Sequence, residues 1–151
     1  MAKPYRLGVV AVFVNEKNLV LLGKRVDLDV WQFPQGGVDA DESTDQALFR
    51  EVLEEVGNNK FDIVKESPDL INYEFPENAS FRLAKKYVGQ RQKWYLCKFH
   101  HGEQPDLDLA VDKEFEEIKW MPAQEAFQNI IYWKKAAYEK GLRELGVSFE
   151  G

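Results

Sequence analysis

Alternating and continuous hydrophobic runs along the chain predict a series of short β-strands. Residues 5–14 are rich in β-branched and aromatic side chains, and the polar segment 15–18 separates them from a second apolar run at 19–22. This pattern is typical of two strands joined by a turn, so we predict a β-hairpin there. Further strands are predicted at 30–33, 62–65, 71–75, 93–99 and 115–121. The segment 78–88 shows no clear period and is predicted to be a loop.

The strongest helical pattern begins after Ser43, a favourable N-cap residue. Gln46 completes a capping box with Ser43, and Gly57 is able to take the left-handed conformation that ends a helix. Between these caps, apolar residues recur every three to four positions and give one buried face. A short helix is predicted at 123–129 and a longer one at 132–145. Together the elements predict an α/β fold, a mixed β-sheet with helices on its faces.

Composition narrows the class of protein. The 151 residues, 44% of them hydrophobic, suit a single domain over residues 1–151 with its own core. No apolar run reaches the roughly 18 residues of a membrane span, and the first ten residues lack the layout of a secretory signal. Cys97 is the one cysteine, so it has no internal disulfide partner and is expected to be a buried, inert thiol. We therefore expect a cytoplasmic protein with no membrane partner.

Charge is distributed unevenly along the chain. The net charge of −6 argues against a non-specific nucleic-acid coat. Residues 81–98, however, contain six basic side chains and no acid, whereas residues 103–117 contain seven acids and one lysine. Either run is compatible with an ordinary solvated face. A metal-dependent phosphate enzyme would also have this arrangement, because acids hold cations and bases hold phosphates.

Three glutamates on the predicted helix form the main candidate for chemistry. Glu51, Glu54 and Glu55 fall on one helical face, where like charges repel each other. Such oxygen-rich clusters suit Mg²⁺ or Mn²⁺, and more than one ion is expected; the alternative is a solvated acidic face. Arg50 is expected to orient these acids by pairing with Glu54 or with Glu42.

The complete spacing around these glutamates is more specific than the acids alone. It reads G-x5-E-x7-R-E-apolar-x-E-E-x-G, formed by Gly36, Glu42, Arg50, Glu51, Val52, Glu54, Glu55 and Gly57. This pattern resembles the signature of the Nudix hydrolases, which cleave nucleoside diphosphates linked to another moiety. The resemblance implies an α/β/α sandwich with a mixed β-sheet. Asn58 departs from it, because the family usually has an apolar residue there.

Candidate catalytic and metal-binding residues come from this segment. Glu51, Glu54 and Glu55 are the expected metal ligands, and the backbone carbonyl of Gly36 is a further candidate because glycine allows close approach. The expected catalytic set consists of Glu51, Glu54, Arg50 and the remote Glu114. The role of Glu114, as a further metal ligand or as the general base, is implied only by the resemblance.

Flanking motifs narrow the resemblance to one subgroup. WQFPQGG at 31–37, GQRQKW at 89–94, the pairs at 5–6 and 114–115, and Trp120 are similar to bacterial RNA 5′-pyrophosphohydrolases and plant-type diadenosine tetraphosphate hydrolases. The resemblance covers residues 5–145 and implies that Arg6, Arg25 and Lys93 contact phosphates. It also implies that Ile131, Trp133 and Lys134 cradle a nucleobase, although core packing is an equally good interpretation of Trp133.

Several substrates fit this chemistry. We expect an RNA 5′-pyrophosphohydrolase acting on 5′-triphosphate RNA; the alternatives are asymmetric hydrolysis of diadenosine tetraphosphate and hydrolysis of a free nucleoside triphosphate. A catalytically inactive nucleotide sensor is a different class, and it should have lost some of the glutamates, all of which are present. The sequence leaves open whether the protein is a monomer or a homodimer.

Overall fold

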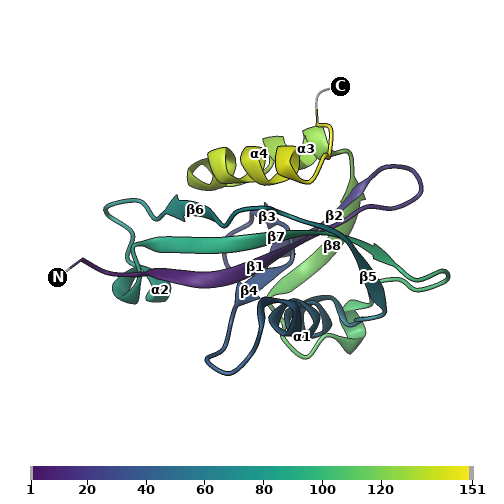
Figure 1. The fold of residues 1–151 in the computed structure, drawn as a ribbon, viewed down its shortest axis with the longest axis horizontal. Helices are drawn as coiled ribbons and strands as arrows, with labels where there is room; N and C mark the ends of the chain where they lie inside the picture. Colours follow the sequence, from purple (N-terminus) through teal and green to yellow (C-terminus); the bar gives the residue numbers. More distant parts are fainter. Residues whose placement is uncertain (1, 150–151) are drawn as a thin grey trace.

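Two β-sheets form the centre of the protein, and helices cover them on both sides. The computed structural model describes residues 2–149. The helix α1 (Thr44–Val56) lies on one side of the sheets, and α3 (Ala123–Gln128) and α4 (Lys135–Glu144) lie on the other (Figure 1). This arrangement confirms the predicted α/β class and the mixed sheet between helices. Within the described chain no helix is long and apolar enough to cross a membrane.

The larger sheet is mixed, and its strands come from both halves of the chain. Its order is β4 (Gln35–Gly37), β1 (Tyr5–Phe13), β7 (Gly89–Phe99) and β5 (Phe61–Glu66), and β6 (Ile71–Glu74) also pairs with β7. The β1–β7 pairing is parallel, whereas the β1–β4, β5–β7 and β6–β7 pairings are antiparallel. The smaller sheet is antiparallel and contains β3 (Trp31–Gln32), β2 (Val20–Arg25) and β8 (Phe115–Met121).

Alternation along β1 explains why helices cover both faces of the sheet. Val10 and Val12 belong to the core beneath α3 and α4, whereas Val9, Ala11 and Phe13 belong to the core beneath α1. All five side chains are at most 1% exposed. Successive residues of a strand point to opposite faces, so one uninterrupted apolar run supplies both cores.

The capping of α1 confirms the sequence prediction. The Ser43 side chain accepts a hydrogen bond from the Gln46 amide N–H, and the Gln46 side chain binds the Ser43 backbone in return. At the other end Gly57 has a φ of 76°, the left-handed conformation. These two ends fix which turn of the helix carries the glutamates.

The predicted hairpin at the start of the chain is wrong. The chain does reverse at residues 15–18, but β1 and β2 enter different sheets and share only the isolated Val14–Val20 bridge. The partner of β1 is β7, which begins at Gly89 rather than at the predicted Lys93 because Tyr5 already pairs with Gly89. Local alternation identifies a strand, but it does not identify a partner distant in the sequence.

The loop prediction for 78–88 is also corrected. It contains the short helix α2 (Arg82–Lys86), whose N-cap Phe81 makes no side-chain capping bond. Ala84 is buried, and its carbonyl accepts a hydrogen bond from the Lys3 ammonium. Tertiary contacts therefore hold a helix that lacks a sequence signal. The final predicted helix is present, although its first turn, Tyr132–Lys134, is a 3₁₀ turn that precedes α4.

Candidate active site

A cavity of about 440 Å³ lies where the two sheets, α1, α2 and the 3₁₀ turn before α4 meet. It brings together side chains that are up to 128 residues apart in the chain, from Arg6 to Lys134. Most of the residues singled out in the sequence line it: Arg6, Arg25, Gly36, Glu51, Glu54, Glu114, Ile131, Trp133 and Lys134. The fold therefore places most of the predicted acidic and basic site residues around one cavity.

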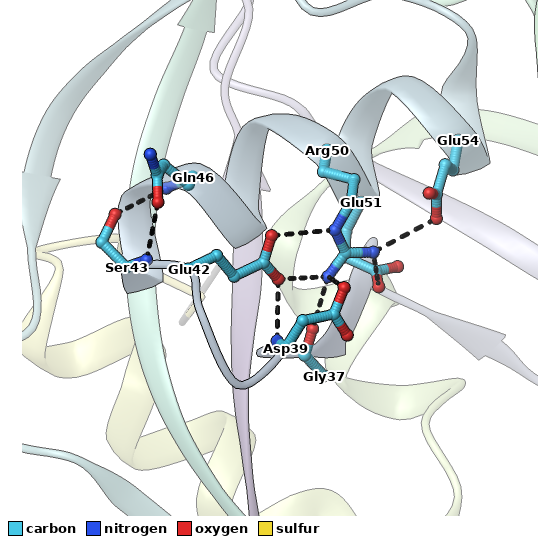
Figure 2. A network of polar contacts seen from close by, with 8 residues as sticks. All are labelled: Gly37, Asp39, Glu42, Ser43, Gln46, Arg50, Glu51 and Glu54. Atoms are coloured by element: carbon cyan, nitrogen blue, oxygen red, sulfur yellow. Dashed lines mark hydrogen bonds and ion pairs between the residues drawn. The ribbon is translucent and has the colours of Figure 1, made fainter.

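Arg50 organises the acidic side of this site without lining the cavity. Figure 2 shows its guanidinium between Glu42 on the preceding loop and Glu51 and Glu54 on α1. Nη1 donates to Glu51 at 2.8 Å and to Glu54 at 3.4 Å, and Nη2 donates to the Gly37 carbonyl at 2.9 Å. The predicted pairing of Arg50 with Glu42 and Glu54 is thus confirmed, and Arg50 ties the glycine turn to the helix.

Glu51 packs directly against the glycine turn. A Cβ atom on Gly36 would come within 2.0 Å of the Glu51 carboxyl carbon, so only glycine allows this approach. Burial raises the pKa of Glu51 to about 7, although Arg50 and, more weakly, Arg6 lower it. Near neutral pH, Glu51 is therefore an acid that gains a proton easily unless a cation stabilises its charged form.

Glu55 lies just behind Glu51 and is completely buried. One carboxylate oxygen accepts a hydrogen bond from the Gln35 amide N–H at 2.9 Å, while the other, Oε2, has no hydrogen-bond partner. Burial first, and the neighbouring Glu114 carboxylate second, raise the pKa of Glu55 well above its ordinary value. The remote acid Glu114 thus meets the glutamates of α1, as the resemblance implies.

The oxygen atoms around the cavity are of the kind that bind a hard divalent cation. Carboxylate oxygens are what Mg²⁺ and Mn²⁺ prefer, and the buried Glu55 Oε2 has no hydrogen-bond partner. Within residues 2–149, however, no three His, Cys, Asp or Glu side chains already converge on one metal position. Arg50 instead binds both Glu51 and Glu54. The ligand types are present, but they are not pre-assembled.

Raised carboxyl pKa values predict that the metal-free protein loses stability as the pH rises. Folded Glu51 keeps a proton that an unfolded glutamate, with a pKa near 4.3, has already lost. The free energy of unfolding in EDTA should therefore fall by about 1 kcal/mol between pH 6 and pH 8. Added Mg²⁺ should reverse this loss at pH 8, because it binds only the folded site. Denaturant titrations at both pH values measure the effect.

The control for this prediction is Glu51→Gln, which cannot ionise. Its stability in EDTA should depend less on pH than that of the original protein, because the group with a pKa of about 7 is gone. An unchanged pH dependence in the variant would show that Glu51 is not the group responsible.

Two arginines line the cavity close to its carboxylates. The Arg6 guanidinium lies over Gly37, where an added Cβ would come within 2.4 Å of its Nη2 atom. Arg25 binds Asp27 through two hydrogen bonds of 2.9 and 2.8 Å, and its Nη1 lies 3.8 Å from Glu114. Positive charge therefore lies directly beside the acidic groups of the cavity, as a bound phosphate chain with its cations would require.

The third wall combines a buried lysine with aromatic rings. Lys134 Nζ lies 3.4 Å from Gln32 Oε1 and 5.6 Å from the centroid of the Tyr73 ring. Burial lowers the pKa of Lys134 to about 8. Trp133 lies beside it, partly packed against the core, and its ring is nearly parallel to that of Phe81, with centroids 6.2 Å apart. Both interpretations of Trp133 therefore apply to it, since it lines the cavity and also packs.

Lys93 is the one expected phosphate contact that the structure does not bring to the cavity. Its ammonium pairs with Glu66 of β5 and lies 5.3 Å from the centroid of the Tyr95 ring. Tyr95 belongs to the core beneath α1, so Lys93 points to the α1 side of the sheet. The motif GQRQKW does reach the cavity, but through Gln90.

Several lining residues were not assigned from the sequence. Gln32, Gln35 and Gln90 lie within motifs that were recognised, yet their side chains received no role. Tyr73 and Phe81 carried no signal, because they come from a predicted strand and from a segment predicted to be a loop. Only the tertiary fold brings these residues to the same cavity.

Comparison with known proteins agrees with the geometry. A family model described as "NUDIX domain" matches residues 4–143. Among solved structures, the chain is similar to the Escherichia coli dihydroneopterin triphosphate pyrophosphohydrolase, with a TM-score of 0.69 and 23% identity over 91% of this chain and 97% of that one. It is also similar to a Caenorhabditis elegans Ap4A hydrolase, with a TM-score of 0.64 and 20% identity over 93% and 95% of the two chains. These two structural similarities support the fold and nothing further.

Sequence relatives are more similar than the solved structures. The chain is 40% identical over 144 residues to a Wolbachia protein named RNA pyrophosphohydrolase, covering 93% of this chain and 88% of that one. It is 37% identical over 148 residues to a Nitratiruptor protein of the same name, covering 93% and 92%. With the family match over residues 4–143 and all the glutamates of the motif in place, the chain belongs to the NUDIX hydrolase family.

Proposed function

We propose that this chain is an RNA 5′-pyrophosphohydrolase. It would convert a 5′-triphosphate end to a 5′-monophosphate end and release pyrophosphate, or two phosphates in sequence, and so initiate RNA decay. The observation that carries the proposal is the identity of 37–40%, over 93% of this chain, to proteins named for this activity. The buried Cys97, which has no disulfide partner, agrees with a reducing, cytoplasmic setting.

The acidic wall supplies the catalytic groups in this proposal. Glu51, Glu54, Glu55 and Glu114, with the Gly36 carbonyl, would hold more than one Mg²⁺ or Mn²⁺ ion. The ions offset phosphate charge and lower the pKa of a bound water. A carboxylate on this wall accepts the proton of the attacking water, and Glu51, Glu54 and Glu114 are the candidates because all three line the cavity. Arg50 orients Glu51 and Glu54 and does not touch the substrate.

Other lining residues hold the substrate in this proposal. Arg6 and Arg25 bind phosphate oxygens, since both line the cavity beside its carboxylates. Ile131, Trp133 and Lys134 form the base-binding edge, where an aromatic face stacks on a base with little dependence on its identity. Lys93 is left out of the proposed contacts, because it pairs with Glu66 outside the cavity.

One observation favours a smaller substrate. The net charge of −6 opposes binding of a long polyanion and fits a dinucleoside polyphosphate such as diadenosine tetraphosphate. That molecule would present the same phosphate chain to the same walls of the cavity. The base-binding edge and the phosphate contacts therefore do not distinguish the two substrates.

A side-by-side hydrolysis assay with Mg²⁺ tests the proposal. A short 5′-triphosphate RNA, diadenosine tetraphosphate and GTP are compared by kcat/KM at equal salt concentration. We expect the RNA to react fastest, because its chain extends beyond the cavity and makes additional contacts. Faster turnover of the dinucleotide would overturn the RNA assignment and keep the hydrolase. Absence of all three activities despite bound metal would instead support a nucleotide sensor.

A further inference from the structure

The helix α2 forms part of the rim of the active-site cavity. Its N-cap residue Phe81 and its first two residues, Arg82 and Leu83, line the cavity. The Phe81 ring also lies nearly parallel to Trp133 on the proposed base-binding edge. The start of α2 and Trp133 therefore lie side by side at the edge of the cavity.

One face of α2 carries three exposed cations. Arg82, Lys85 and Lys86 stand at i, i+3 and i+4 on the helix and so share a face, and all three are exposed. None of them forms a salt bridge within the described residues, and residues 78–102 contain no acid. Other cations near the cavity, such as Arg25 and Arg50, are paired with carboxylates. This face therefore carries a local positive charge, although the whole chain has a net charge of −6.

The fold holds these cations together despite their mutual repulsion. Like charges at such spacing destabilise a helix, and α2 is only five residues long and lacks a side-chain N-cap. The burial of Ala84 and the hydrogen bond from Lys3 Nζ to the Ala84 carbonyl offset that cost. A bound polyanion would reduce the repulsion, whereas no acid forms a salt bridge with these three cations within residues 2–149.

The other members of the basic run do not join this face. Lys93 pairs with Glu66, and the Arg91 guanidinium lies over the Tyr5 ring and binds Asn72. Lys98 lines a separate groove at the far end of β7. The structure thus reduces a run of six basic residues to three that lie beside the cavity.

We propose that the exposed face of α2 binds the backbone phosphates of RNA immediately 3′ of the nucleotides held in the cavity. This inference rests on the proposed function and deepens it. Arg82 lies at the cavity and Lys85 and Lys86 lie one turn further along the helix, over about 6 Å of helix axis. A free nucleoside triphosphate or a dinucleoside polyphosphate has no backbone phosphates to place there. The α2 face therefore makes the enzyme sensitive to the length of the RNA chain.

The test uses the double variant Lys85→Gln/Lys86→Gln, which leaves the cavity residues unchanged. For a 5′-triphosphate RNA of about eight nucleotides, kcat/KM should fall roughly tenfold, because two phosphate contacts are lost. The dependence of log kcat/KM on log salt concentration should become shallower by about 1.4, at about 0.7 for each contact to a single strand. Hydrolysis of GTP should be unchanged.

Lys17→Gln/Lys98→Gln is the matched control. Both lysines are exposed and line the separate groove. Lys98 lies near the C-terminal end of β7, whereas α2 comes shortly before the first residue of that strand. This variant has the same net charge as the test variant, so it separates a local contact from a change in overall charge. It should keep the kcat/KM and the salt dependence of the original protein for the longer RNA.

The outcomes separate the two proposals. If the original protein hydrolyses the longer RNA no faster than GTP, the proposed function fails. If it prefers RNA but the two double variants behave alike, the role of α2 is overturned while the function stands. A final experiment measures binding of the original protein and the α2 variant to vesicles of anionic lipid by sedimentation. Loss of vesicle binding in the α2 variant, with RNA kinetics unchanged, would assign the face to a membrane surface and overturn the inference.

Discussion

Replacing Glu54 by Gln is expected to lower kcat by at least about a hundredfold, because the neutral amide binds Mg²⁺ poorly and cannot accept a proton from water. Glu54 lines the cavity, and its side chain is 36% exposed with one hydrogen bond, of 3.4 Å, to Arg50. The substitution should therefore change the free energy of unfolding by less than about 0.5 kcal/mol. Turnover of 5′-triphosphate RNA and a denaturant titration measure the two effects separately.

Glu117→Gln is the control for this experiment. Glu117 is an exposed acid on β8 and does not line the cavity. The variant therefore removes the same negative charge at a position outside the active site. Its kcat should match that of the original protein. Activity of Glu54→Gln at the level of this control would contradict the assignment of Glu54 to the catalytic wall.

Replacing Arg50 by Ala should cause the largest loss of stability at the site. Arg50 binds the Gly37 carbonyl, Glu42, Glu51 and Glu54, and its side chain is only 29% exposed. Its removal leaves Glu51 and Glu42 without their cation, so we expect the free energy of unfolding to fall by about 2 kcal/mol, less than for a fully buried pair. Urea titrations in EDTA measure this loss.

Arg50→Lys distinguishes charge from geometry in this network. Lysine restores the positive charge but cannot reproduce a planar fork that reaches the loop and two positions of α1 at once. Stability should be partly restored, whereas kcat should stay low because Glu51 and Glu54 are no longer oriented together. Full activity of the lysine variant would show that Arg50 acts only through its charge.

Local signals in the sequence were sufficient for α1 and its glutamates. Ser43, Gln46 and Gly57 determine where the helix begins and ends, and these caps depend on residues at most four positions apart. The same holds for the pairing of Arg50 with Glu42, which lies eight residues earlier in the chain. Functional residues that lie within one continuous segment can therefore be predicted from their spacing in the sequence.

The parts that failed depend on long-range contacts. The pairing of β1 with β7 joins Tyr5 to Gly89, and no local pattern in either strand specifies the other. Phe81 and α2 were missed because a helix of five residues is too short to show a helical repeat of apolar residues, and it has no side-chain N-cap to mark its start. Lys93 was misplaced for a related reason, since the motif fixes its position along β7 but not the face of the sheet to which it points.

The β1–β7 ladder also has a consequence for synthesis of the chain on the ribosome. Every residue of β1 pairs with a residue between Gly89 and Cys97, so the first strand to emerge must wait for more than eighty further residues. During that interval β1, whose apolar run supplies both cores, can pair only with the three-residue strand β4 on one of its edges. Such non-local pairing slows folding and exposes hydrophobic surface to aggregation. The N-terminal strand is therefore a segment of this protein that would benefit from a chaperone during translation.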